Sequence, residues 1–352
     1  MADVLSDFDG LLDWPNLQAW IAEQAELPGA GPVTAVEQIT GGSQNNIFRL
    51  TRGDAQLVLR RPPQHLRSNS NDTMMREARV LSAIDGTDVP HPRFYAVCDD
   101  AEVIGACFYL MEPITGFTPM GQLPGRYADD VEWRRRLAFE LVEGAAKLGA
   151  VDPDAVGLGD FGKKDNWIER QVNRWKSQLD GYSEFEGYGK PDLPGVDQIG
   201  AWLDANRPAD AHIGIIHGDY QFANVMFAFD EPKLAAAIDW ELSSLGDPLL
   251  DLAWVLQSWS EPTDPPGKDP QLQPWDGMPS RAELIAHYGE VSGRDMSAMP
   301  WFFVLACYKL GILLEGTYAR ARAGKAPKEM GDIMHWYAGW LFTLADQNVR
   351  QA

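Results

Sequence analysis

Disulfide frameworks and membrane spans are poorly supported by this sequence. Its 352 residues include only three cysteines, Cys98, Cys107 and Cys307. That number is low and odd, so we expect free structural thiols. No uninterrupted apolar run approaches the ~20 residues that a bilayer requires. The acidic N-terminus, MADVLSDFDG, has neither the basic nor the apolar region of a signal peptide, so we expect a soluble cytoplasmic protein.

Positive charge is also scarce. Lys and Arg number 30 against 51 Asp and Glu, which gives a formal net charge of −21. This argues against a nucleic-acid partner, because nucleic-acid binding needs a basic surface. An acidic surface would attract a cationic substrate over about a Debye length. It would equally serve solubility alone, and both interpretations stay open.

The order of the predicted elements divides the chain into two lobes of an α+β fold. A single core stops growing at roughly 250–300 residues, and this chain is longer. Residues 1–111 are predicted to form a small lobe, an antiparallel sheet with one main helix. Its elements are a short helix at 14–24, strands at 34–40, 46–52 and 55–61, a helix at 71–84 capped by Asn71 or Asp72, and a hairpin over 93–112.

Residues 112–352 are predicted to form a larger and mostly helical lobe. Apolar residues recur at helical spacing over 131–148, 166–179, 295–323 and 334–347. One strand-like region, 213–238, interrupts this pattern. A Pro-rich segment, 259–278, is either a mobile insert or the rim of a site.

The strand-like region contains the stretch IIHGDYQFANVMF, which places polar groups between two apolar runs. Asp219 and Asn224 lie on the predicted loop, and Asp239 and Glu241 follow the next apolar run, AAAI. These side chains are hard oxygen ligands or bases. Mg²⁺ prefers one or two carboxylates together with phosphate oxygens, and phosphoryl transfer also needs a carboxylate that orients the attacking hydroxyl. The spacing therefore suits a phosphotransferase, although a capped loop with surface acids would give the same composition.

The motifs HGDYQFAN and IDWELSSLGDPLLDLA together resemble the aminoglycoside phosphotransferase-like family. The resemblance covers most of residues 35–255 and implies a bilobal protein-kinase-like fold. It implies that Asp219 is the catalytic base and that Asn224 and Asp239 hold Mg²⁺, with Glu241 as a further metal-region carboxylate. His217 enters the catalytic motif, where its expected part is to hold the loop together. Asp251 resembles the buried Asp that braces this loop from the following helix.

The same resemblance implies a nucleotide site in the small lobe. The turn containing Gly41, Gly42, Ser43, Gln44 and Asn45 would cover the phosphates of ATP or GTP. Arg60 stands where the family usually has a Lys that contacts phosphate, and Glu77 would be its partner. Because Arg is bulkier and binds through a planar fork, the substitution leaves nucleotide geometry open. Backbone groups near Glu112 and Ile114 would contact the base of the nucleotide.

The acceptor is expected to be the hydroxyl of a small molecule. Eleven residues separate Asp239 from Asp251, too few for the activation segment of a protein kinase. The acidic surface would fit an aminoglycoside-like acceptor. The segments VLRRPP and GTYARARAG instead resemble the kinase-like domain that is fused to some acyl-CoA dehydrogenases, which implies a hydroxyacyl thioester or another metabolite as the acceptor. A catalytically silent nucleotide-binding protein is the remaining alternative. The sequence does not indicate the oligomeric state.

Overall fold

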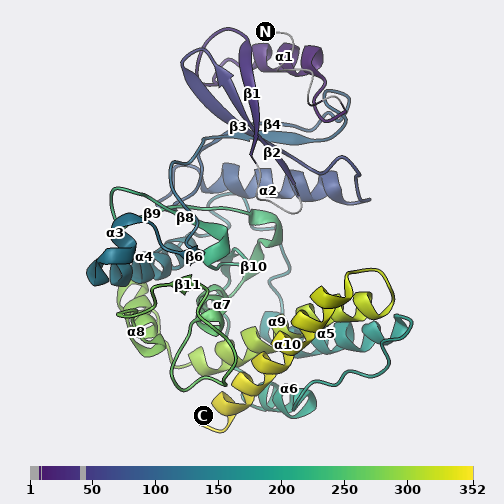
Figure 1. Ribbon diagram of the computed structural model, residues 1–352, viewed down its shortest axis with the longest axis vertical. Helices are drawn as coiled ribbons and strands as arrows, with labels where there is room; N and C mark the ends of the chain where they lie inside the picture. Colours follow the sequence, from purple (N-terminus) through teal and green to yellow (C-terminus); the bar gives the residue numbers. More distant parts are fainter. Residues whose placement is uncertain (1–7, 9, 40–44, 352) are drawn as a thin grey trace.

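The computed structural model describes residue 8, residues 10–39 and residues 45–351. A small lobe built around a sheet lies above a larger helical lobe (Figure 1). The predicted α+β bilobal fold is therefore confirmed. Strand β5 ends at Met111, next to the predicted lobe boundary, although the assignment of two domains with that boundary stays a prediction.

The small lobe contains a five-stranded antiparallel sheet in the order β1-β2-β3-β5-β4. The strands are β1 (Val33–Ile39), β2 (Asn46–Arg52), β3 (Ala55–Arg61), β4 (Phe94–Cys98) and β5 (Phe108–Met111). Side chains alternate between its faces, as strand geometry requires. Leu57 and Leu59 pack in the small-lobe core, whereas Val58 joins the core of the large lobe. The sheet therefore connects two hydrophobic clusters.

Two helices cover the sheet. Helix α1 (Trp14–Glu23) begins after Asp13, whose carboxylate accepts the N–H of Asn16 at 3.1 Å. Helix α2 (Ser70–Ile84) buries Met74, Glu77 and four further residues of one face. The predicted cap on α2 is wrong, because the helix begins after Asn69 and no side chain caps it. Asn71 instead accepts the backbone N–H of Cys107 at 3.1 Å, which ties α2 to the segment before β5.

Short strands form a scaffold at the centre of the large lobe. They are β7 (Gly214–Ile216), β8 (Val225–Phe227), β9 (Leu234–Ala237) and β10 (Ser244–Gly246). Strand β8 pairs with β9, and β7 pairs with β10, both antiparallel. The 3₁₀ turns η3 (Phe222–Asn224) and η4 (Trp240–Leu242) lie between them. The predicted strand-like region thus forms β7, β8 and β9, while β10, the partner of β7, lies beyond it. The loops that follow β7 and β9 carry the acidic residues.

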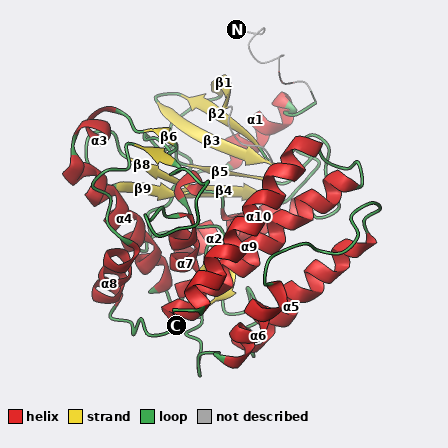
Figure 2. Ribbon diagram, turned by 60° about the horizontal axis from the view of Figure 1, so that its bottom comes forward, coloured by secondary structure: helices red, strands yellow, loops and turns green. Residues whose placement is uncertain are grey.

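Helices make up most of the rest of the large lobe (Figure 2). They are α3 (Gly125–Asp129), α4 (Val131–Gly149), α5 (Trp167–Gly181), η2 (Tyr182–Glu184), α6 (Val196–Ala205), α7 (Leu249–Ser258), α8 (Arg281–Ser292), α9 (Met299–Arg322) and α10 (Lys328–Val349). Helix α9 packs against α10, α7, α5 and α6. It is long and apolar enough to cross a membrane by length and composition, but 67% of its most apolar window is buried within the protein.

Two further expectations concern the cysteines and the Pro-rich segment. All three cysteines are free and buried, as predicted.

Segment 259–278 packs against the large lobe: its strand β11 (Leu272–Gln273) pairs in parallel with β6 (Gly121–Gln122). Trp259 at its start is fully buried and donates to the carbonyl of Pro279 at 2.8 Å. Its start and its strand β11 therefore belong to the packed structure of this lobe.

Candidate active site

Asp219 lies on the loop between β7 and β8 and accepts three side-chain hydrogen bonds. Gln221 Nε2 and Trp254 Nε1 both donate to Oδ1 at 2.8 Å. Asn224 Nδ2 donates to Oδ2 at 2.7 Å. Asp219 remains half-buried, whereas Trp254 is buried. The carboxylate is therefore held in one orientation by neighbours from its own loop and from α7, and it keeps some contact with solvent.

Asp251 fixes the start of this loop from the first turn of α7. Its Oδ2 accepts the backbone N–H of His217 at 2.6 Å, and its Oδ1 accepts that of Gly218 at 3.0 Å. Burial raises the pKa of the Asp251 carboxyl, and these two donors act in the opposite direction. The His217 ring is fully buried with Nε2 2.9 Å from the carbonyl of Ile238. The bracing by Asp251 is confirmed, and the contacts of His217 are those of a positioning residue.

Gly218 is a position where only glycine fits the loop. Its φ is +85°, and a Cβ built there would lie 2.3 Å from the carbonyl oxygen of Leu242. We expect Gly218→Ala to lower the free energy of unfolding by about 2 kcal/mol, from the left-handed backbone and this clash together. Gly189→Ala is the matched control, because Gly189 has a φ of +78° with nothing within 4 Å. Equal losses in urea unfolding would show that the Leu242 contact has no effect.

The β8–β9 hairpin brings Asn224 and Asp239 to the same end. Val225 is paired with Ala237, and the N–H of Ile238 donates to the carbonyl of Asn224 at 2.9 Å. Asp239 follows with a φ of +67°, a left-handed conformation that Asp adopts more readily than most residues. Oxygen atoms of Asp239, Glu241 and Glu77 lie within 4.8 Å of one another. These hard oxygen donors, with the side-chain oxygen of Asn224, suit Mg²⁺.

Arg60 lies beside this acidic cluster. Its Nε is 3.0 Å from Glu77 Oε2, and its NH2 is 2.5 Å from Asp239 Oδ1. Tyr109 donates its hydroxyl to the same Glu77 oxygen at 3.0 Å. Burial by itself lowers the pKa of Arg60, but the surrounding Tyr109, Glu77 and Asp239 raise it overall. Burial also raises the pKa of Glu77 to about 7, which Arg60 opposes. The pairing of Arg60 with Glu77 is as predicted, while its contact with Asp239 is new.

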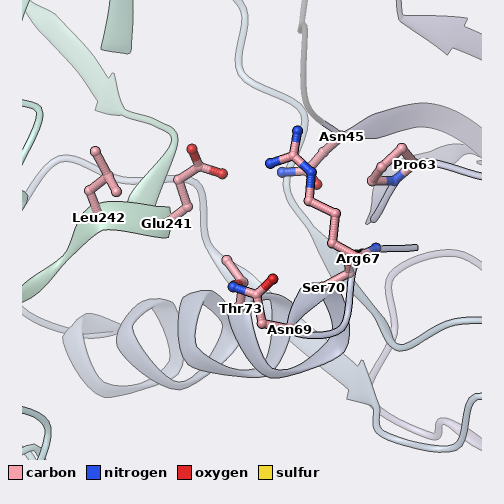
Figure 3. A pocket seen from close by; sticks show the side chains of 8 residues that line it. All are labelled: Asn45, Pro63, Arg67, Asn69, Ser70, Thr73, Glu241 and Leu242. Atoms are coloured by element: carbon pink, nitrogen blue, oxygen red, sulfur yellow. Dashed lines mark hydrogen bonds between the residues drawn. The ribbon is translucent and has the colours of Figure 1, made fainter. Parts of the chain in front are cut away.

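The predicted phosphate-covering turn is described only at its end. Gly41, Gly42, Ser43 and Gln44 lie outside the described residues. Asn45 lines a pocket of about 450 Å³ between the two lobes. Its other lining residues are Pro63, Arg67, Asn69, Ser70, Thr73, Glu241 and Leu242. Figure 3 shows Arg67 and Glu241 extending into it from opposite lobes. The pocket thus borders both the turn and the carboxylate cluster.

Glu112 and Ile114 follow β5 at the connection between the lobes. The N–H of Glu112 donates to the carbonyl of Arg93 at 2.9 Å and is already used. Within the described part of the chain, the carbonyl of Glu112 and the N–H of Ile114 have no hydrogen-bond partner. One acceptor and one donor two residues apart are the groups that the edge of a purine base could engage.

Two contacts at this site were not anticipated from the sequence. Trp254 lies within an apolar helix pattern, in which a tryptophan is expected to be a core residue. Its indole N–H nevertheless donates to Asp219. Lys309 lies in the apolar helix α9, and its Nζ donates to the carbonyl of Gly218 at 3.3 Å. The sequence feature that could have identified Lys309 is its charge within a largely apolar helix. No sequence signal distinguishes Trp254 from the other tryptophans.

Known relatives and solved structures resemble this chain in sequence and in fold. The chain is 30% identical over 331 residues to acyl-CoA dehydrogenase family member 11 of Rattus norvegicus, covering 90% of this chain and 41% of that protein. It thus spans about two fifths of this relative's length. A candidate aminoglycoside phosphotransferase of Ralstonia eutropha superposes with a TM-score of 0.80 at 30% identity, covering 95% of this chain and 98% of that one.

More distant structures share the fold. The GDP and kanamycin complex of an aminoglycoside 2″-phosphotransferase superposes with a TM-score of 0.61 at 15% identity, over 91% of this chain and 98% of that one. The expected resemblances, to phosphotransferases and to a domain of acyl-CoA dehydrogenase family proteins, are both confirmed. The model of the phosphotransferase enzyme family matches residues 35–285. The chain therefore belongs to the phosphotransferase enzyme family and is a phosphotransferase with a kinase-like fold.

Proposed function

We propose that the protein is a Mg²⁺-dependent kinase that transfers the γ-phosphoryl group of ATP or GTP to a hydroxyl of a small molecule. The observation that carries the proposal is the arrangement around Asp219. This carboxylate is oriented by Asn224, which lies at the same hairpin end as Asp239. One base and a set of hard oxygen ligands are thereby brought together, which is the arrangement that phosphoryl transfer requires.

Each residue has a defined part in the proposed reaction. Asp219 accepts a hydrogen bond from the acceptor hydroxyl and aligns it for in-line attack. Asn224 and Asp239, with Glu241 nearby, would hold Mg²⁺, which neutralises charge on the phosphates when bound. Arg60 would contact the phosphates through its fork while Glu77 keeps it in place. Positioning and charge neutralisation then supply most of the rate enhancement.

For the acceptor we propose a hydroxyacyl thioester, or a hydroxy acid related to it. The rat relative is named as an acyl-CoA dehydrogenase family member, and a kinase acting beside such an enzyme would share its acyl substrates. Kanamycin is the ligand named for a structure that shares only the fold. An aminoglycoside-like acceptor is therefore the alternative outcome of the screen below.

A nucleotide-consumption screen tests the proposal. ATP and GTP would each be offered with Mg²⁺ and with hydroxyacyl thioesters, hydroxy acids, amino alcohols or kanamycin, followed by mass spectrometry of the product. We expect one acceptor class to gain a single phosphoryl group. Tight nucleotide binding without turnover for any class would instead support a silent nucleotide-binding protein.

The metal assignment can be tested at Asp239. We expect Asp239→Asn to raise the Mg²⁺ concentration for half-maximal turnover roughly tenfold or more, because a charged ligand is lost. Nucleotide binding without Mg²⁺ is the control, since it reports any damage caused by releasing Arg60. An unchanged Mg²⁺ dependence would show that Asp239 is not a metal ligand.

A further inference from the structure

Lys309 is a cation close to the proposed catalytic base. It projects from α9, and its Nζ is 3.3 Å from the carbonyl of Gly218, the residue before Asp219. The same Nζ lies 4.3 Å from the ring centroid of Trp254 and 5.5 Å from that of Trp175. Lysine ammonium groups are attracted to the faces of such rings. Helices α5, α7 and α9 together therefore place one positive charge beside the catalytic loop.

Trp254 links this cation to the reacting carboxylate. Its indole N–H donates to Asp219 at 2.8 Å while its ring lies under Lys309. Trp254 is buried, whereas Asp219 and Lys309 both remain partly exposed. Trp254 therefore brings the Asp219 carboxylate and the Lys309 ammonium into one network of contacts.

The protein itself uses little of the hydrogen-bonding capacity of Lys309. An ammonium group has three donors, and within residues 45–351 only the long bond to Gly218 occupies one. Both oxygens of Asp251 are already occupied by backbone donors. Burial lowers the pKa of Lys309 to about 8, with Asp251 and Asp219 acting in the opposite direction and Arg174 reinforcing the decrease. The group is therefore mainly charged at neutral pH and has donors to spare.

A second cation lies on the same aromatic patch. The Arg174 guanidinium is 4.8 Å from the centroid of the Trp175 ring that also faces Lys309. Two positive groups therefore lie around the Trp175 ring, although the chain as a whole has a net charge of −21. They favour a ligand that carries oxygen lone pairs or negative charge, and they repel ammonium groups.

We propose that Lys309 is a specificity-determining residue that binds a carbonyl or carboxylate oxygen of the acceptor, close to its reacting hydroxyl. It would thereby favour hydroxyacyl groups and disfavour polycationic amino sugars. This inference rests on the proposed function, because it assumes that the acceptor hydroxyl lies at Asp219. The shared chemistry is an acyl oxygen, which either a free hydroxy acid or its thioester would supply.

The test compares Lys309→Met with Lys309→Arg on four matched acceptors. Hydroxybutyryl-coenzyme A and hydroxybutyrate carry the acyl oxygen, butanediol is neutral and aminobutanol is cationic. We expect Lys309→Met to lower kcat/KM for the acyl acceptors roughly 10- to 100-fold, the range for a hydrogen bond to a charged group. The KM for nucleotide should stay unchanged, aminobutanol should improve relative to hydroxybutyrate, and Lys309→Arg should restore part of the loss.

The outcomes separate the two proposals. If Lys309 only held the catalytic loop through Gly218, Lys309→Met would lower turnover equally for all four acceptors and for nucleotide hydrolysis by water, and the inference would be overturned. The inference would also be overturned if the unaltered protein were active and Lys309→Met had the same acceptor preference. The absence of any turnover in the unaltered protein would overturn the proposed function. Thermal unfolding of both variants checks that the packing around residue 309 survives.

Discussion

Replacing Asp219 with asparagine is expected to lower kcat by roughly 100- to 10,000-fold, the usual contribution of a positioned acid or base. The variant keeps the shape of the side chain and retains one acceptor oxygen for Trp254 and Gln221, which now donate to Oδ1. It loses the charge that would align the acceptor hydroxyl. The measurement is the initial rate of phosphorylated product formation at saturating nucleotide.

The control for this variant is a carboxylate outside the site. Asp192 is exposed in the loop before α6, so Asp192→Asn changes the net charge equally and should leave kcat unchanged. Nucleotide affinity of Asp219→Asn should also match that of the unaltered protein, because the defect lies on the acceptor side. A kcat within threefold of the original would exclude Asp219 as the base.

Replacing Arg60 with methionine is expected to lower the free energy of unfolding by about 3–5 kcal/mol. Arg60 and Glu77 are both buried, and the substitution leaves Glu77 without its cationic partner. Asp239 also loses its 2.5 Å contact. Removing one member of a buried ion pair costs far more than the pair contributes, because the remaining charge is desolvated without compensation. Urea unfolding measures the loss.

Arg49 on the neighbouring strand offers the matched control. Its ion pair with Glu37 is exposed, with side chains 38% and 69% accessible, so Arg49→Met should cost less than about 1 kcal/mol. Arg60→Lys would keep the charge without the fork and should fall between the two variants in stability. Equal losses for Arg60→Met and Arg49→Met would contradict the buried-pair account. An unchanged KM for nucleotide in Arg60→Met would show that Arg60 does not contact the phosphates.

Several features could be predicted from the sequence because they depend on neighbours along the chain. The spacing from His217 to Asn224 placed one loop between two strands, and β8 and β9 then formed the predicted hairpin. The strands predicted at 46–52 and 55–61 agree with β2 and β3, and the two strands pair across the tight turn at Gly53. Local patterns of this kind carry most of the information about which element forms.

Other features depend on distant packing and could not be predicted in this way. The predicted cap on α2 is wrong because the helix begins after Asn69, and Asn71 inside it accepts the N–H of Cys107, 36 residues away. The contact of Trp254 with Asp219 requires the register of α7 on the catalytic loop. Glu77 joined Asp239 and Glu241 only because the two lobes meet at that point. Each case brings together groups whose separation in sequence carries no periodic signal.

The ion pair between Arg60 and Asp239 also has a consequence for folding kinetics. The two residues are 179 positions apart in the sequence, so their meeting closes a very long loop, whose entropy must be lost before the contact can contribute. Contacts of such high order form late, after the local hairpins and helices. A refolding chain should therefore regain its helical circular dichroism before Arg60 can make its proposed contact with the phosphates. Activity should be the last property to return.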